Sequence, residues 1–125
     1  MIVPMYAAVF ALFYIYLALR VIKARRQYQV ALGDGQEKMV QKAIRVHGNF
    51  SEYVPFALLL LFFLEQKNPN TIWLHSLCIA LCVGRLICAY GVSAPRENLK
   101  FRVTGMVITF AVMIAISIHL LITSL

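Results

Sequence analysis

The sequence predicts an all-α integral membrane protein, a bundle of four transmembrane helices. Hydrophobic residues make up 62% of the 125 residues and charged residues only 14%, a composition that soluble domains of this size do not have. The mean hydropathy is +0.78. Four long apolar segments account for nearly the whole chain, so residues 1–125 are expected to form a single transmembrane domain without a soluble part.

The first two predicted helices differ in polarity. Residues 1–19 contain no charged residue and would extend about 28 Å as a helix, close to the hydrocarbon thickness of a bilayer. This segment lacks the basic start and the small cleavage-site residues of a signal peptide, so we expect it to be retained. The second helix should begin near Gln36, and it is wholly apolar only over residues 54–64.

Two more helices complete the predicted bundle. The turn sequence at residues 68–70 places Asn70 or Thr71 as the N-cap of a third helix over residues 71–92. Arg85 is the only charged residue in that helix. The fourth predicted helix, residues 103–125, carries no charge.

The third helix also contains Cys78 and Cys82, which fall on one face. No further metal ligands accompany them in the sequence. We therefore expect no metal site, and packing is the simpler role for these cysteines.

The formal net charge of +7 is concentrated in two loops. Because Lys and Arg close to membrane spans favour the cytoplasmic side, both termini are expected on the opposite side. The positive charge suits acidic lipid head groups and would attract a small anionic substrate. Since the cations are tied to bilayer edges, nucleic acid is not an expected partner. The cations around the first loop are Arg20, Lys23, Arg25, Arg26, Lys38 and Lys42, and those around the third are Arg96, Lys100 and Arg102.

A polar stripe in the first half of the second helix is the clearest indication of function. Arg45, Asn49 and Glu52 are separated by four and three residues, which leaves their side chains within roughly 60° of one another on a helix. Lys38 and Lys42 extend the stripe toward water. Such groups are costly at the edge of the hydrocarbon, so the stripe should face a protein interior. A single four-helix unit cannot hide it, which predicts that several copies of the chain assemble.

Three segments of the sequence carry a resemblance to a known family. Residues 21–28 read Val-Ile-Lys-Ala-Arg-Arg-Gln-Tyr, residues 45–55 read Arg-Val-His-Gly-Asn-Phe-Ser-Glu-Tyr-Val-Pro, and residues 101–103 read Phe-Arg-Val. The chain resembles the membrane-associated proteins in eicosanoid and glutathione metabolism (MAPEG). This family includes microsomal glutathione transferases, leukotriene C synthase and prostaglandin E synthase.

The resemblance implies a homotrimer that binds glutathione between subunits near the cytoplasmic edge of the membrane. Glutathione has two carboxylates, an amine and a thiol, so its site needs guanidinium groups, a carboxylate and an amide, and this sequence supplies each type. The match assigns glutathione binding to Arg45, Asn49, Glu52 and Tyr53, with contributions from His47 and Arg25 and, on the third helix, Arg85 and Tyr90. Arg85 and Tyr90 are spaced two residues closer than their counterparts in the eicosanoid enzymes, so the resemblance defines the substrate side of the pocket less well.

Catalysis requires the glutathione thiolate, since a free thiol with a pKa of about 8.5 is mostly protonated at neutral pH. The resemblance assigns the stabilising cation to Arg102, with Arg96 as the competing choice. It also implies a role for Arg26 at an epoxide substrate, as in leukotriene C synthase. The implied activity is conjugation of glutathione to lipophilic electrophiles, or reduction of lipid hydroperoxides.

Less specific explanations exist for the same residues. Arg45, Asn49 and Glu52 can form a structural hydrogen-bond network between helices. Arg25 and Arg26 can be simple membrane anchors. His47 points roughly 200° away from Arg45 on the helix and can face a neighbouring helix instead.

Two other classes of protein compete with a glutathione-dependent enzyme. The same family contains a non-catalytic accessory protein that binds lipid, although the polar stripe argues against that function here. Small four-helix multidrug transporters have a similar size but depend on a glutamate in the first helix, and residues 1–19 contain none.

Overall fold

The computed structural model describes residues 1–93 and 98–125, and these residues form four helices and no strand. The helices are α1 (Val3–Tyr28), α2 (Lys38–Glu65), α3 (Thr71–Ser93) and α4 (Leu99–Ser124). Each is long and apolar enough to cross a membrane. The predicted all-α class with four candidate membrane spans is confirmed.

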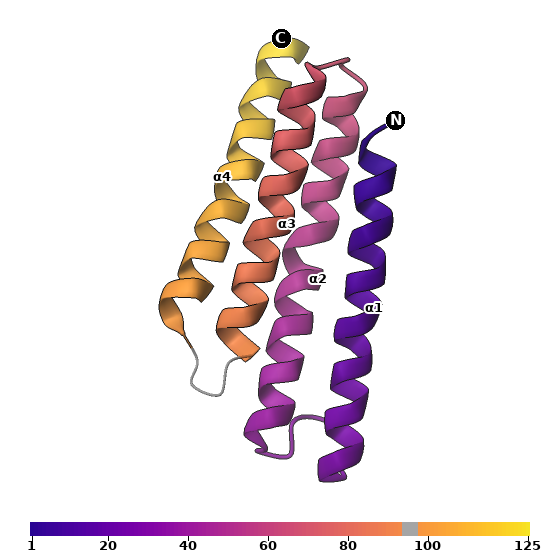
Figure 1. Ribbon diagram of the computed structural model, residues 1–125, viewed down its shortest axis with the longest axis vertical. Coiled ribbons are helices and arrows are strands. Elements are labelled where there is room, and N and C mark those ends of the chain that lie inside the picture. Colours follow the sequence, from indigo (N-terminus) through magenta and orange to yellow (C-terminus); the bar gives the residue numbers. More distant parts are fainter. Residues whose placement is uncertain (94–97) are drawn as a thin grey trace.

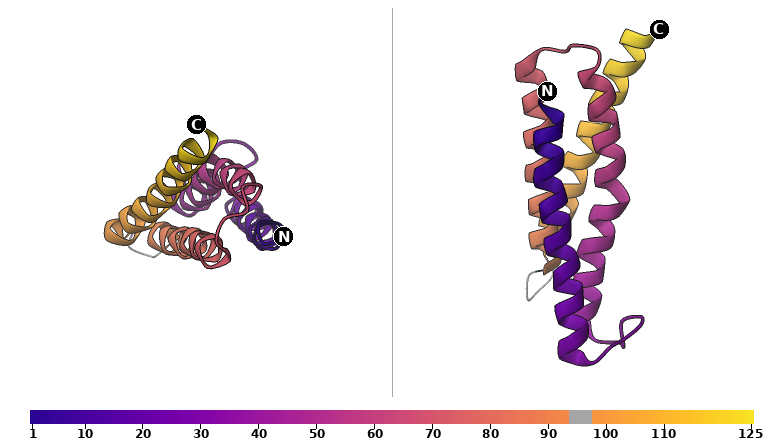
Figure 2. Two further views of the ribbon diagram at one scale, coloured as in Figure 1. Left: turned by 90° about the horizontal axis from the view of Figure 1, so that it is seen from above. Right: turned by 90° about the vertical axis from the view of Figure 1, so that its right-hand side faces the viewer.

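The helices alternate in direction, so both termini lie at one end of the bundle (Figure 1). Viewed along the bundle, α2 and α3 lie between α1 on one side and α4 on the other (Figure 2). The α1–α2 hairpin extends past the adjoining ends of α3 and α4 (Figure 1). The basic residues of the first loop therefore lie on this projection.

Two helix boundaries differ from those predicted because polar residues extend the helices. The apolar residues alone predict a first helix that ends at Leu19, whereas the family resemblance places the end of this helix within residues 21–28. In the structure, α1 continues to Tyr28 and ends where Gln29 adopts a left-handed φ of 55°. Arg25 and Arg26 lie in its last turn, where cations interact favourably with the helix dipole. The charged residues suit a segment outside the hydrocarbon, but they do not end the helix.

The fourth helix begins earlier than the predicted Val103. The Asn98 side-chain oxygen accepts a hydrogen bond from the Phe101 backbone N–H at 3.3 Å, which is the contact of an N-cap. Lys100 and Arg102 consequently belong to the first turn of α4.

The other two helix starts agree with the sequence to within two residues. Gln36 has a left-handed φ of 60°, so α2 begins just beyond it, at Lys38. The Asn70 side-chain oxygen accepts a hydrogen bond from the Ile72 backbone N–H at 2.8 Å. Of the two candidate caps for the third helix, Asn70 is therefore the one used.

Close backbone contact joins α3 and α4. A Cβ atom at Gly105 would lie 2.5 Å from the Gly84 carbonyl oxygen and 2.7 Å from the Cys88 backbone nitrogen. One at Gly91 would lie 2.7 Å from the Arg102 backbone nitrogen. Neither position has room for a side chain, so glycine allows the two helices to touch and sets the position of the first turn of α4.

Candidate functional site

A buried arginine joins three helices in the centre of the bundle. Arg85 on α3 is only 3% exposed. One of its terminal nitrogens donates to the Asn49 side-chain oxygen on α2, and the other donates to the Thr109 hydroxyl on α4 at 3.3 Å. The Tyr53 ring lies 6.0 Å from the guanidinium carbon, a cation–π distance. Asn49, Tyr53 and Arg85 are thus predicted site residues that the fold brings together.

Within the described residues, Arg85 contacts no carboxylate. Its Nε atom is buried and has no hydrogen-bond partner in the described part of the chain. A buried guanidinium that is paired only with neutral groups keeps its full positive charge in a low-dielectric setting. The cluster therefore favours an anion nearby.

The Asn49–Arg85 contact also defines the depth of the site. Arg85 lies eight residues before Ser93, the last residue of α3, which corresponds to about 12 Å along the helix. Because α2 and α3 are antiparallel, Arg45 lies about 6 Å nearer to that end than Asn49, and Glu52 about 4.5 Å farther in.

Arg45 and Glu52 form an ion pair beside this cluster. Arg45 Nη1 lies 3.9 Å from Glu52 Oε1, and their side chains are 50% and 54% exposed. Asn49, which lies between them in the sequence, is only 6% exposed. The stripe therefore divides. Its middle residue packs inward against α3, while the two charged residues lie on the outer surface of this single chain.

The side chain of His47 faces α1. Its ring stacks on Tyr14 with a centroid distance of 4.8 Å and an interplanar angle of 16°, and Tyr14 also stacks on Phe50 at 5.6 Å. This is the orientation expected if His47 contacts a neighbouring helix, away from Arg45. In this chain, His47 is separated from the Asn49–Arg85 cluster.

Arg25 and Arg26 lie at the end of α1, on the projecting hairpin. Arg25 donates to the Gly33 carbonyl oxygen in the first loop at 2.5 Å, whereas Arg26 is exposed. Neither forms a hydrogen bond or ion pair with Arg85, Asn49 or Glu52 in this chain. A role for either in the site requires a neighbouring subunit or a bound molecule.

Arg102 and Tyr90 lie at the junction of α3 and α4. Arg102 is partly buried, and its backbone packs against Gly91, about 9 Å along α3 from Arg85. Tyr90 is 63% exposed and makes an edge contact with Phe101 at 5.6 Å, so it lies outside the central cluster. The alternative cation, Arg96, falls outside the described residues.

Three residues of the cluster were not predicted from the sequence. Thr109 accepts from Arg85 and donates to the Gly105 carbonyl at 2.8 Å. The Met106 sulfur lies 3.6 Å from Arg85 Nη1, and the Cys88 sulfur lies 3.6 Å from the Asn49 oxygen. A threonine in the middle of an apolar helix was the available signal for Thr109, because such residues commonly hydrogen-bond across membrane helices.

No group of three or more potential metal ligands of the His, Cys, Asp or Glu type gathers among the described residues. Cys78, Cys82 and Cys88 are free thiols. The groups of the cluster are a guanidinium, an amide, a hydroxyl and a phenol, a set that suits the binding of an anionic organic molecule.

Comparison with known proteins assigns the family. The model of the MAPEG family matches residues 3–122. The chain belongs to the MAPEG family. It is 36% identical over 114 residues to the protein called "Inner membrane protein YecN" in Escherichia coli (strain K12), a match that covers 91% of this chain and 86% of that relative. The protein of the same name in Escherichia coli O6:H1 matches equally well. No solved structure matches the chain significantly.

This MAPEG protein is a multi-pass integral membrane protein. The relative is named as an inner membrane protein, and all four helices have the length and hydropathy of membrane spans. The polar cluster around Arg85 therefore lies within the membrane-spanning part of the bundle.

Proposed function

We propose that this MAPEG protein is a glutathione-dependent membrane enzyme that conjugates lipophilic electrophiles or reduces lipid hydroperoxides. Membership of the family supports the proposal, because the family includes glutathione transferases. The arrangement of polar residues on α2 supports it independently, since that arrangement matches the chemical groups of glutathione.

The half-exposed Arg45–Glu52 pair carries the proposal. Within a membrane-spanning helix, a charged pair is costly if it faces lipid. A structural ion pair would lower that cost by being buried, but half of each side chain is open in this chain. A ligand with both carboxylate and ammonium groups would satisfy Arg45 and Glu52 together, and glutathione has both.

Asn49 would act as a hydrogen-bond donor in this site. Its oxygen already accepts from Arg85, so the amide NH₂ is the group left for a ligand. That group would bind a carbonyl or carboxylate oxygen of glutathione. Tyr53 and Arg85 would form the inner wall, while Arg25 and His47 would contribute from other faces of a trimer.

Arg102 would stabilise the thiolate. In the proposed reaction the thiol loses its proton, the sulfur attacks an electrophilic carbon, and a leaving group departs or an epoxide opens. With a hydroperoxide, the sulfur instead attacks the terminal oxygen, the O–O bond breaks and the alcohol leaves with a proton. The thiol of a second glutathione then displaces water from the resulting sulfenic acid to form the disulfide. A cation near the sulfur lowers the pKa of the thiol and so raises the thiolate fraction at neutral pH. Arg26 would contact an epoxide oxygen.

The proposal includes a homotrimer with its site near the cytoplasmic face and both termini on the other side. A second copy packed on α2 would cover the Arg45–Glu52 pair and bring the exposed Arg26 of a neighbouring α1 toward it. Mass measurement in mild detergent should give three copies. Detection of monomers or dimers alone would contradict a site shared between subunits.

A non-catalytic, lipid-binding function is the second candidate. One observation favours it: the Asn49 oxygen is used by Arg85, as in a purely structural network. In that case the bundle would keep its polar centre for packing specificity and bind lipid on its apolar faces.

Activity assays of the purified protein in detergent test the two candidates. The protein should turn over glutathione with a haloarene or with a lipid hydroperoxide, and calorimetry should detect glutathione binding. Binding without turnover of either substrate would exclude the proposed enzyme for those substrate classes. Absence of glutathione binding would support the accessory function.

A further inference from the structure

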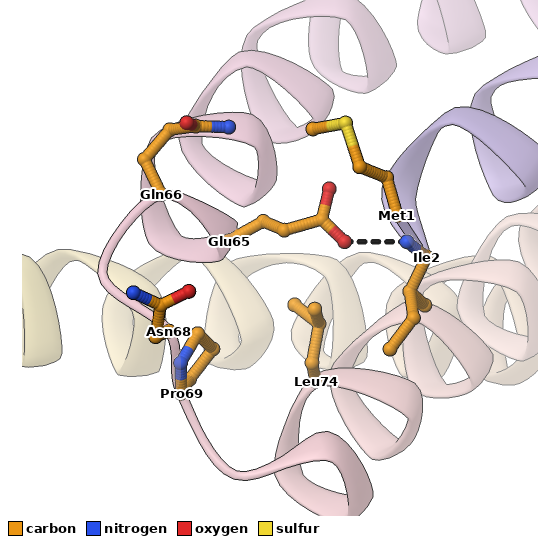
Figure 3. A pocket seen from close by; sticks show the side chains of 7 residues that line it. All are labelled: Met1, Ile2, Glu65, Gln66, Asn68, Pro69 and Leu74. Carbon is orange, nitrogen blue, oxygen red and sulfur yellow. Dashed lines mark hydrogen bonds between the residues drawn. The ribbon is translucent and has the colours of Figure 1, made fainter.

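A polar cavity lies at the end of the bundle away from the first loop, where the N-terminus of α1 meets the end of α2. Its volume is about 570 Å³, within the range of small-molecule sites. The side chains that form its walls are shown in Figure 3. They are Met1, Ile2, Glu65, Gln66, Asn68, Pro69 and Leu74.

Glu65 is the charged residue of this cavity. Its Oε2 atom accepts hydrogen bonds from the backbone N–H groups of Ile2 and Val3, the latter at 3.2 Å. No side chain of α1 itself caps that helix, so Glu65 provides its cap from α2. The capping of α1 therefore accounts for the hydrogen bonds of one carboxylate oxygen, Oε2.

The other carboxylate oxygen, Oε1, takes no part in capping α1. Glu65 Oε1 is buried and has no hydrogen-bond partner among the described residues. In Figure 3 it points away from Ile2 into the space between Met1 and Gln66. A buried, unpaired carboxylate oxygen is costly, which indicates that a donor occupies this space when the site is filled.

The remaining walls define the kind of donor. Asn68 and Gln66 add amide groups, whereas Met1, Ile2, Pro69 and Leu74 are apolar. A metal ion would require several more oxygen ligands. A primary ammonium provides three donors and one positive charge, and the apolar walls suit a hydrocarbon chain attached to it.

We propose that this cavity binds the ammonium group of a primary amine with a hydrocarbon chain, with Glu65 as its counter-ion. No side-chain cation lines the cavity, since Lys67 is exposed and lies outside it, so a ligand would compete for the carboxylate only with the α-ammonium of Met1. Met1 is 80% exposed, and its unbranched side chain can swing aside to admit the ligand. This site is independent of glutathione.

Titration of the full-length protein in detergent with hexylammonium tests the proposal. Trp73, the only tryptophan in the sequence, adjoins Leu74 of the cavity wall and serves as a fluorescent reporter, with calorimetry as the second readout. We expect saturable binding of hexylammonium and none of hexanol at the same concentrations. Equal binding of hexanol, or no binding of hexylammonium, would overturn the proposal.

Two glutamate variants form a matched pair. Glu65→Gln keeps an oxygen that can cap α1 but removes the charge, and it should weaken hexylammonium binding at least about tenfold. Glu37→Gln removes the same charge at the other end of the bundle and should leave binding unchanged. Equal affinity in Glu65→Gln and the unaltered protein would refute the role of Glu65.

Asn68→Gly provides an independent test should Glu65→Gln fail to fold. Asn68 is exposed and has a left-handed φ of 53°, which glycine adopts without strain. Loss of its amide should weaken hexylammonium binding several-fold, and unchanged affinity would count against the cavity as the binding site.

Competition experiments in lipid nanodiscs decide whether the natural amine is a lipid head group or a soluble molecule. If the natural ligand is a phospholipid head group, phosphatidylethanolamine should compete with hexylammonium while phosphatidylcholine, whose quaternary ammonium has no N–H donor, should not. If neither lipid competes, the site takes a soluble amine. Competition by both lipids alike would show that the cavity binds acyl chains without recognising the ammonium, and would overturn the proposal.

Discussion

Replacement of Asn49 separates its structural role from its proposed role in binding. Its oxygen is the α2 partner of the buried Arg85 guanidinium, and its NH₂ group is available to a ligand. Asn49→Ala removes both. Hydrogen bonds to charged groups contribute about 1.5–3 kcal/mol, so Asn49→Ala should lower the free energy of unfolding by about 2–3 kcal/mol. It should also abolish glutathione binding.

Asn49→Asp tests the two groups separately. The aspartate retains an acceptor for Arg85 but has no NH₂ donor, so stability should fall less than in Asn49→Ala while glutathione binding is still lost. Unfolding in mixed micelles with increasing dodecyl sulfate, followed by circular dichroism, measures the first quantity. Calorimetry with glutathione measures the second.

A double-mutant cycle with Arg85→Met completes the test. In a protein that already carries Arg85→Met, Asn49→Ala should lower the free energy of unfolding by a smaller amount. The difference is the coupling energy, which we expect to be about 1–2 kcal/mol. Zero coupling would show that the Asn49–Arg85 contact does not stabilise the fold. Full glutathione affinity in Asn49→Asp would show that the NH₂ group binds nothing, and would refute the assignment of Asn49 to the ligand.

Four further substitutions test other parts of the molecule. Glu52→Gln should weaken glutathione binding without disrupting assembly, because the half-exposed carboxylate is needed for the ligand amine; unchanged affinity with a dissociated oligomer would indicate a structural ion pair. Arg45→Ala should mainly raise the Michaelis constant for glutathione, whereas Arg102→Ala should lower turnover at neutral pH and recover in part as pH rises. Gly105→Ala should cost about 1–3 kcal/mol or more from overpacking, since its Cβ would lie 2.5 Å from the Gly84 carbonyl; an unchanged thermal midpoint would contradict the close α3–α4 contact.

The four helices were predictable from the sequence because hydropathy and length determine membrane spans almost without tertiary information. Their ends were less predictable. The first helix does not stop where its apolar residues stop, at Leu19, and the start of α4 depends on the cap supplied by Asn98. Both are local polar effects that average hydropathy does not contain.

The polar stripe shows a different limit. Helical spacing correctly groups Arg45, Asn49 and Glu52 on neighbouring faces, but it does not say which neighbouring helix each residue meets. Asn49 turns inward because Arg85 of α3 lies opposite, a pairing between residues separated by 36 positions. Tyr90 illustrates the same limit, since spacing alone did not reveal that its side chain lies outside the cluster.

Arg85 also bears on the chemistry of the proposed site, through its charge. Its contacts within the described residues are neutral, so its field is not cancelled locally. At an effective dielectric constant of about 20, two unit charges about 4 Å apart interact by about 4 kcal/mol, and this energy falls as the separation grows. A thiolate bound near Arg85 would therefore be stabilised, and the pKa of its thiol lowered, by an amount set by that separation.

Arg102→Ala should therefore restore only part of the free thiol pKa. We expect the thiol of bound glutathione, followed by its thiolate absorbance, to titrate between its value in the unaltered protein and about 8.5. Arg102→Ala combined with Arg85→Gln, which keeps a donor for Asn49, should move it the rest of the way. A full return to the free value in Arg102→Ala alone would assign all of the thiolate stabilisation to Arg102 and leave Arg85 with a structural role.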